Sequence, residues 1–249
     1  MSRAEISAPG TEPEPGRWRV SRRTAALVAA SACATVLVVA AVRLSAELTR
    51  GPTPAERAAA AAAEVAGRYR AWPAGRIFPA GIPYTLGQSS PATASRVGIG
   101  TDTRCAPAAD DALARSLVVR GCRAVLRATY LDQTQGLAVT VGVAVFPDER
   151  SAREAAEWFP DRAPRPGLRA LPFEGSVAAR FGDAARQASA AAQRGPYVVA
   201  ATAGYADGRP ALRGPLADFA ELAPQLARAV LAPLATPAEV RCGDREWRC

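Results

Sequence analysis

The sequence predicts an α+β domain, a small antiparallel sheet with helices packed on one face, preceded by one transmembrane helix and a helical stalk. Three observations lead to this fold class. An uncharged apolar stretch lies near the N-terminus, an Ala- and Pro-rich segment follows it, and strand-like alternation mixes with helical periodicity beyond residue 76. The boundaries that follow are a cytoplasmic arm (1–23), a transmembrane helix (24–42), a linker with a stalk helix (43–75) and an extracytoplasmic domain (76–249).

The composition excludes several kinds of catalytic site. The 249 residues include 31 Arg but no Lys, no His and no Asn, and the formal net charge is +8. Without His there can be no Ser-His-Asp or Cys-His site and no His-ligated zinc. Without Lys there can be no Schiff base and no Walker-type phosphate lysine. Because Ala, Arg, Gly and Pro have GC-rich codons, we interpret the missing residue types first as codon bias.

The N-terminal segment predicts an arm followed by a membrane span. Residues 1–23 are rich in Pro, Gly, Glu and Ser, a composition typical of disorder. Residues 24–42 carry no charge, and as a helix of 19 residues they would extend about 28 Å, close to the ~30 Å hydrocarbon core. The positive-inside rule places the N-terminus in the cytoplasm. The arginines that set this orientation are Arg17, Arg19, Arg22 and Arg23.

Three alternatives to an uncleaved signal-anchor stay open. A cleavable secretory signal would release the rest of the chain as an exported soluble protein, although Leu44 occupies a position where such signals need a small residue. Residues 21–23 (Ser-Arg-Arg) are similar to a twin-arginine export signal. Residues 30–33 (Ala-Ser-Ala-Cys) are similar to a lipoprotein cleavage box. Each pattern departs from its usual form, so we favour the anchor.

The stretch after the span predicts a capped helix and then an extended arm. Thr53 is a suitable N-cap, Pro54 suits the first turn, and Glu56 occupies the reciprocal capping position. We therefore expect a helix over residues 54–71, either as a stalk or packed lightly on the domain. Residues 76–84 are apolar and Pro-rich without periodicity, and we expect an arm laid over the core rather than an exposed recognition loop.

Cysteine content predicts two disulfides in the outer domain. An even number of cysteines in an exported segment favours a disulfide framework. Three pairings of the four cysteines are possible. Proximity in the sequence favours Cys105–Cys122 and Cys242–Cys249. The four residues are Cys105, Cys122, Cys242 and Cys249. Because no C-x2-C pair is present, we predict no zinc site, and no metal or cofactor.

Residues 122–132 and 137–146 predict a β-hairpin. A strong apolar face alternates with small residues in the second stretch, which is the period of two typical of a strand. This face consists of Leu137, Val139, Val141, Val143 and Val145. Residues 133–136 supply the turn, with Gly136 available for a positive φ. Asp148 then caps a helix that we expect to run to about Phe159.

The last part of the chain predicts one more strand and a long helix. Residues 196–206 form the strand, and residues 216–234 form a helix that Pro224 kinks or splits. The apolar face of this helix consists of Phe219, Leu222, Leu226, Val230 and Leu234. Residues 184–193 fit either a helix, which their Ala content favours, or an edge strand.

No motif identifies a catalytic site. Asp110 and Asp111 are adjacent, but Asp110 is better explained as the start of a helix, and Asp207-Gly208 is a turn signal. Arg residues are scattered singly, so we expect no nucleic-acid binding. Acid pairs far apart in the sequence leave open a carboxylate-dependent hydrolase outside the membrane. We instead expect a binding or interaction module without catalysis, with the lipid bilayer as one partner and a membrane or envelope protein as a candidate second partner.

The layout resembles that of membrane-anchored proteins of high-GC actinobacteria, with a short arm, one membrane helix, an Ala/Pro linker and a disulfide-bearing α+β domain. The outer domain is similar in architecture to the extracytoplasmic sensor domains of mycobacterial serine/threonine kinases, which also use two disulfides and a sheet with helices. The resemblance implies a sensor-like or accessory role. It carries no functional residue over to this chain.

Overall fold

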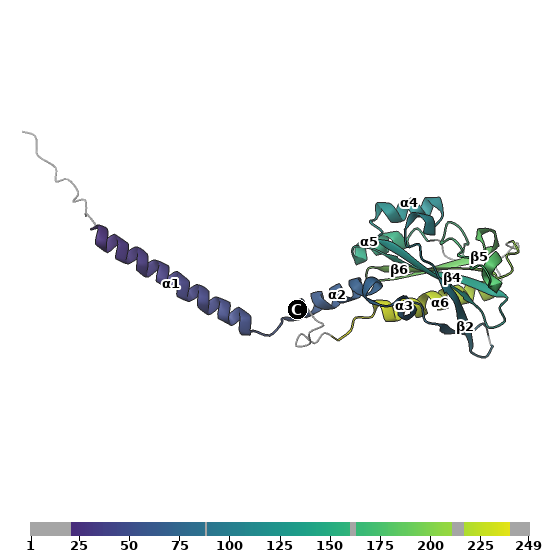
Figure 1. Ribbon diagram of the computed structural model, residues 1–249, viewed down its shortest axis with the longest axis horizontal. Coiled ribbons are helices and arrows are strands. Elements are labelled where there is room, and N and C mark those ends of the chain that lie inside the picture. Colours follow the sequence, from purple (N-terminus) through teal and green to yellow (C-terminus); the bar gives the residue numbers. More distant parts are fainter. Residues whose placement is uncertain (1–20, 88, 160–162, 211–216, 240–249) are drawn as a thin grey trace, which may run out of the picture. The chain divides into compact units, whose positions relative to one another are not determined.

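The structure, a computed structural model, describes residues 21–87, 89–159, 163–210 and 217–239. Its contacts divide the chain into two units, residues 1–52 and residues 53–249. The first unit holds the helix α1 (Arg22–Thr49), and the second is an α+β domain, which confirms the predicted fold class (Figure 1). Four predicted site residues lie outside the described residues, namely Arg17, Arg19, Cys242 and Cys249.

Among the described residues, α1 is the one helix whose length and apolar composition suit a membrane crossing, and a signal sequence close to the N-terminus would share both properties. Ser21 is its N-cap and accepts a hydrogen bond from the backbone N–H of Thr24. The helix continues to Thr49, past the predicted end at residue 42. This extension follows from residues such as Leu44 and Leu48, which have high helix propensity.

Six strands form one antiparallel sheet in the order β1-β2-β3-β4-β6-β5. The strands are β1 (Gly81–Tyr84), β2 (Ala92–Ile99), β3 (Ala124–Leu131), β4 (Leu137–Val145), β5 (Arg186–Arg194) and β6 (Tyr197–Tyr205). The predicted hairpin is confirmed as β3 and β4, and the predicted third strand as β6. Residues 184–193 mostly form the edge strand β5 rather than a helix, because pairing with β6 outweighs the helix propensity of alanine.

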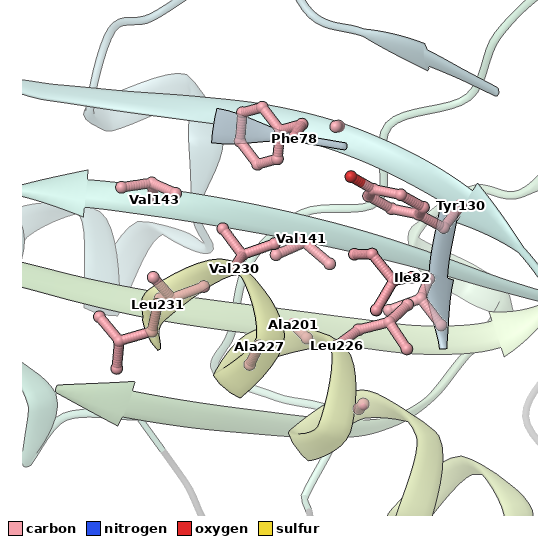
Figure 2. Close-up of a cluster of buried hydrophobic side chains, with 14 of the residues drawn as sticks. Phe78, Ile82, Tyr130, Val141, Val143, Ala201, Leu226, Ala227, Val230 and Leu231 are labelled. Atoms are coloured by element: carbon pink, nitrogen blue, oxygen red, sulfur yellow. The ribbon is translucent and has the colours of Figure 1, made fainter. Parts of the chain in front are cut away.

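Helices cover both faces of this sheet, so the prediction that they pack on one face was wrong. The helix α6 (Ala217–Ala235) covers the first face, where its side chains pack on the valines of β4 (Figure 2). The helices α4 (Asp111–Val119) and α5 (Glu149–Ala156) lie on the second face (Figure 1). Both faces need cover because the central strands are apolar on both sides. Second-face residues include Val125, Ala144, Val198 and Ala200.

α6 is continuous across Pro224, so the helix is not split there. The five apolar residues predicted for its buried face are all fully buried. They lie on both sides of the proline, and we attribute the single helix to the packing of both halves on one sheet.

The segment before the sheet packs on the domain. The helix α2 (Pro54–Ala71) has the predicted capping box between Thr53 and Glu56. It buries Val65, and its Arg68 donates hydrogen bonds to three carbonyls near the end of α6. The predicted arm forms the short helix α3 (Ala74–Ile77) and β1, with Phe78 fully buried in the core.

Candidate functional site

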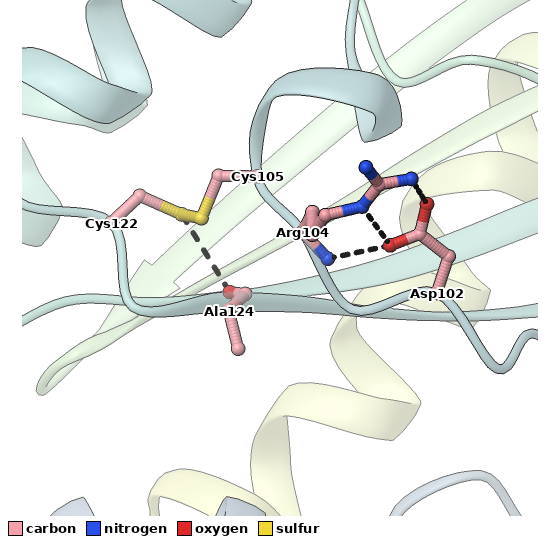
Figure 3. The surroundings of a disulfide bond; sticks show 5 residues. All are labelled: Asp102, Arg104, Cys105, Cys122 and Ala124. Carbon is pink, nitrogen blue, oxygen red and sulfur yellow. Dashed lines mark hydrogen bonds and ion pairs between the residues drawn. A yellow bond between two sulfur atoms is a disulfide. The ribbon is translucent and has the colours of Figure 1, made fainter.

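The disulfide favoured by sequence proximity, Cys105–Cys122, is present (Figure 3). Cys122 follows the C-terminal end of α4, and Cys105 comes directly before the 3₁₀ helix Ala106–Ala108. Beside the bond, the Arg104 guanidinium donates to both carboxylate oxygens of Asp102, and these hydrogen bonds hold the pKa of Asp102 well below its usual range. The side chain of Arg104 is 77% exposed and that of Asp102 is 35% exposed, so this pair lies at the surface.

Asp110 and Asp111 do not form a catalytic pair. Asp110 stands at the N-cap of α4, but its carboxylate accepts hydrogen bonds from the Arg186 guanidinium and from the N–H of Gly167, each at 2.9 Å. Burial raises the pKa of Asp110, but these hydrogen bonds outweigh burial, so the net shift of this pKa is downward. Asp111 instead pairs with Arg169 at the surface. Each carboxylate joins α4 to the segment after residue 163.

Asp207-Gly208 is confirmed as a turn. Gly208 has a φ of +80°, which favours glycine, and Asp207 accepts hydrogen bonds from the backbone and side chain of Arg209. This acid therefore closes the chain after β6.

A row of buried hydroxyl groups crosses the second face of the sheet. The four residues are register partners on β3, β4, β6 and β5, namely Thr129, Thr140, Thr202 and Ser189. The Thr129 hydroxyl donates to the carbonyl of Leu171, and the N–H of Leu171 donates to the Thr140 hydroxyl. These hydrogen bonds fasten residues 163–173 to the sheet. The row thus helps to hold the fold together, except for the Thr202 hydroxyl, which has no hydrogen-bond partner among the residues that the structure describes.

Two adjoining hollows open around the turn of the β3–β4 hairpin. One, of about 520 Å³, extends along β2 toward Arg96, and the other, of about 540 Å³, extends toward Tyr84. Ala92, Asp132 and Gln133 line both hollows. The turn therefore separates two compartments of one candidate binding site.

Hydrogen bonds to Asp132 and Tyr84 hold the backbone of this turn in place. Asp132 is buried, and its two carboxylate oxygens accept hydrogen bonds from the N–H groups of Thr134 (3.0 Å) and Leu137 (2.7 Å). The N–H of Gln133 donates to the hydroxyl of Tyr84 at 3.1 Å. As a result the side chain of Gln133 is exposed on a fixed backbone, and that of Gln135 is exposed two residues later. Such preorganisation reduces the entropy that a ligand must overcome.

Eight of the 17 residues that line the hollows carry neutral hydrogen-bonding groups, and three are charged, namely Arg96, Asp132 and Asp218. The eight neutral residues form the largest polar group. They are hydroxyls and amides together with one aromatic ring, namely Ser89, Ser90, Thr93, Ser95, Gln133, Thr134, Gln135 and Tyr84. Hydroxyl and amide groups both donate and accept, so they match a polar ligand without net charge. No group of three potential metal ligands occurs in the described part of the chain.

Two carboxylates, Asp132 and Asp218, line the larger hollow. A carboxylate-dependent hydrolase would need such a pair in one cavity. However, both oxygens of Asp132 are occupied by N–H groups of its own turn, while Asp218 is exposed. The arrangement is therefore better developed for binding than for acid–base chemistry.

Our sequence reasoning identified the turn at residues 133–136 but not the site around it. The available signal was the density of Ser, Thr and Gln in two stretches, residues 85–95 and 133–135. Comparison of the chain with protein-family models, curated proteins and solved structures finds no match.

Proposed function

We propose that this chain is a single-pass membrane protein whose extracytoplasmic domain binds a small, neutral, polar ligand without catalysis. In this proposal α1 is the anchor, and the Arg residues that precede its apolar residues 24–42 keep the N-terminus in the cytoplasm. Its partners are the lipid bilayer and, as a further candidate, another membrane or envelope protein that responds to the ligand-bound domain. This role is sensor-like or accessory.

One observation carries the binding role, namely the pair of hollows on either side of Gln133. Each hollow is within the range typical of small-molecule sites. The hydrogen bonds of Asp132 and Tyr84 fix the turn between them. A turn that is rigid and lined by neutral hydrogen-bonding groups is suited to recognition of hydroxyl and amide groups.

The proposal is tested by thermal unfolding of the full chain in lipid nanodiscs. The probes are neutral mono- and disaccharides and amino-acid amides. We expect at least one probe to raise the unfolding temperature of the wild type. The double variant Gln133→Ala/Gln135→Ala should lose this shift. Without a probe it should unfold at the same temperature as the wild type, because both amides are exposed.

The matched control is Gln193→Ala. Gln193 lies on the edge strand β5, where its amide donates to the carbonyl of Gly195, and it lines neither hollow. This control should keep the ligand-induced shift. The binding role is contradicted if no probe stabilises the wild type, or if the double variant responds as the wild type does.

A carboxylate-dependent hydrolase is the second candidate, because Asp132 and Asp218 share a hollow. Chromogenic glycosides and esters would be offered to the full chain and to Asp218→Asn. Turnover by the wild type that Asp218→Asn abolishes would favour the hydrolase. Ligand-induced stabilisation without turnover favours the binding module.

A further inference from the structure

The domain exposes a small cluster of large apolar side chains at the ends of α4 and α5. Outside α1, the exposed large apolar residues among those described are Val118, Val119, Trp158 and Val177. Val118 and Val119 end α4, and Trp158 lies just beyond α5. The Arg120 guanidinium lies over the Trp158 ring, 5.4 Å from its centroid, and joins the two helix ends. We call Val118, Val119 and Trp158 the α4–α5 patch.

This patch is held rigidly, although its side chains point into solvent. Gly121 has a φ of +75°, and its N–H donates to the carbonyl of Val118, while the N–H of Cys122 donates to that of Leu117. These two bonds form a Schellman motif that ends α4. The disulfide to Cys105 then fixes the next residue (Figure 3). Val119 nevertheless remains 82% exposed, so its side chain lies at the surface of a rigid helix end and does not pack in the core.

The charges around the patch are mainly positive. Arg115 lies on the exposed face of α4 and Arg123 follows the disulfide, and neither has an ion pair among the described residues. Arg120 lies within the patch. Two exposed acids oppose them, Glu157 next to Trp158 and Asp148 next to Pro147, which lies beside Gly121. The local balance therefore favours a negatively charged partner surface.

We infer that the α4–α5 patch rests on the surface of an anionic lipid bilayer. This inference rests on the proposed anchoring of the chain by α1. Three apolar side chains are far fewer than the 20–30 residues that each partner usually contributes to a stable protein interface of about 800 Å² per side. A tethered domain needs much less, because the anchor keeps lipid at a high effective concentration. Tryptophan and arginine are both favoured at the membrane–water interface.

The placement has a consequence for the binding site. The patch lies at the end of the β3–β4 hairpin where Ala124 pairs with Val145, whereas the hollows surround the turn beyond Leu131. A strand of eight residues separates these ends by about 25 Å. A domain that rests on the patch directs its hollows away from the lipid, toward ligands in solution.

Quenching of Trp158 by brominated lipids tests this inference. The full chain, with Trp18, Trp72 and Trp247 changed to Phe, would be reconstituted into vesicles of brominated phosphatidylglycerol with phosphatidylcholine, or of brominated phosphatidylcholine alone. We expect quenching of Trp158 in the anionic vesicles and a loss of quenching in the neutral ones. High salt should also reduce it, because salt screens the Arg residues.

Two variants distinguish the patch from general contact with lipid. Val119→Asp should abolish the quenching, whereas Val177→Asp should not, because Val177 precedes Ala178, which packs at the opposite end of the hairpin with Leu131. An unquenched Trp158 in anionic vesicles overturns the inference, including the case in which crosslinking shows a second copy covering the patch. Extraction of the chain by alkaline carbonate would instead show that the anchor itself, and with it the proposed function, is wrong.

Discussion

Three of the described arginines, Arg68, Arg127 and Arg186, are buried. Two of them, Arg68 and Arg186, donate hydrogen bonds to backbone carbonyls. Arg186 donates to the carbonyl of Leu168 and to the carboxylate of Asp110. Arg68 donates hydrogen bonds to carbonyls at the end of α6, and it also donates to the carboxylate of Glu64. A buried cation without such partners would be costly. Part of the arginine content, which composition suggested was codon bias, is therefore structural.

The pH dependence of stability tests the role of Asp110. Its pKa is lowered in the folded state, so its contribution is fully present above the unfolded-state value of about 4 and is lost as the pH falls through the folded-state pKa. Asp110→Asn should lower the unfolding temperature at neutral pH, and its difference from the wild type should shrink in acid. Asp111→Asn is the control, because that carboxylate is exposed, and it should change little at any pH. Parallel pH curves for Asp110→Asn and the wild type would contradict this role.

Asp132 should be required for the stability of the turn between the hollows. Asp132→Ala leaves the N–H groups of Thr134 and Leu137 without their acceptor, and we expect a loss of about 1–3 kcal/mol in the free energy of unfolding. Urea titration of the full chain measures this loss. Asp207→Ala, at the exposed turn after β6, should have only a small effect. An equal loss of unfolding free energy for the two substitutions would contradict this prediction, because it would mean that the buried position of Asp132 does not strengthen its contribution to stability.

At the scale of elements, the disulfide should contribute more to the free energy of unfolding than any single hydrogen bond does. Cys105 and Cys122 are 17 residues apart, and closing a loop of this length stabilises a protein by about 3 kcal/mol in the chain-entropy model. The double variant Cys105→Ser/Cys122→Ser should lose about that amount in urea titration. Cys33→Ser should lose nothing, because Cys33 is a free, exposed residue of α1. A double variant as stable as the wild type would contradict the entropy model here.

Elements with a strong local pattern could be predicted from the sequence. The Val alternation of residues 137–145 and the capping box at Thr53 are such patterns, and both elements formed where expected. The strand β2 (ATASRVGI) has no apolar alternation, and it exists because its backbone pairs with β1 and β3. The Ala-rich β5 likewise depends on β6. Both strands are thus determined by the strands with which they pair, which a local apolar pattern does not show.

The candidate site was beyond prediction for the same reason. Residues 133–136 were predicted as a turn, but the hollows also need Tyr84, Arg96 and Asp218 from three other parts of the chain. Only the sheet order, with β2 between β1 and β3, and the packing of α6 bring these residues together. The cysteine pairing, in contrast, was predictable because Cys105 and Cys122 are close in the sequence.

At the scale of the whole molecule, the orientation of α1 decides whether the domain meets ligands outside the cell. Before the apolar residues 24–42, the four Arg residues have no acidic neighbour between residues 15 and 23. After these apolar residues, Arg50 is paired with Glu47. An export-dependent reporter fused after residue 100 should be active, and the same reporter after residue 15 should be inactive. Activity at residue 15 would reverse the topology and place the hollows in the cytoplasm.

Whether a signal peptidase cleaves α1 is a separate question from the orientation of α1. In the proposed orientation, residues 53–249 would be exported whether or not α1 is cleaved. Mass spectrometry of the mature chain distinguishes the two outcomes, and for an anchor we expect an N-terminus within the first residues and recovery from the membrane fraction. A fragment in the medium that begins after residue 40 would show that α1 is a cleaved signal. The disulfide, the hollows and the α4–α5 patch would then belong to a soluble protein. Such a protein would lack the tether that allows so small a patch to hold the domain on lipid.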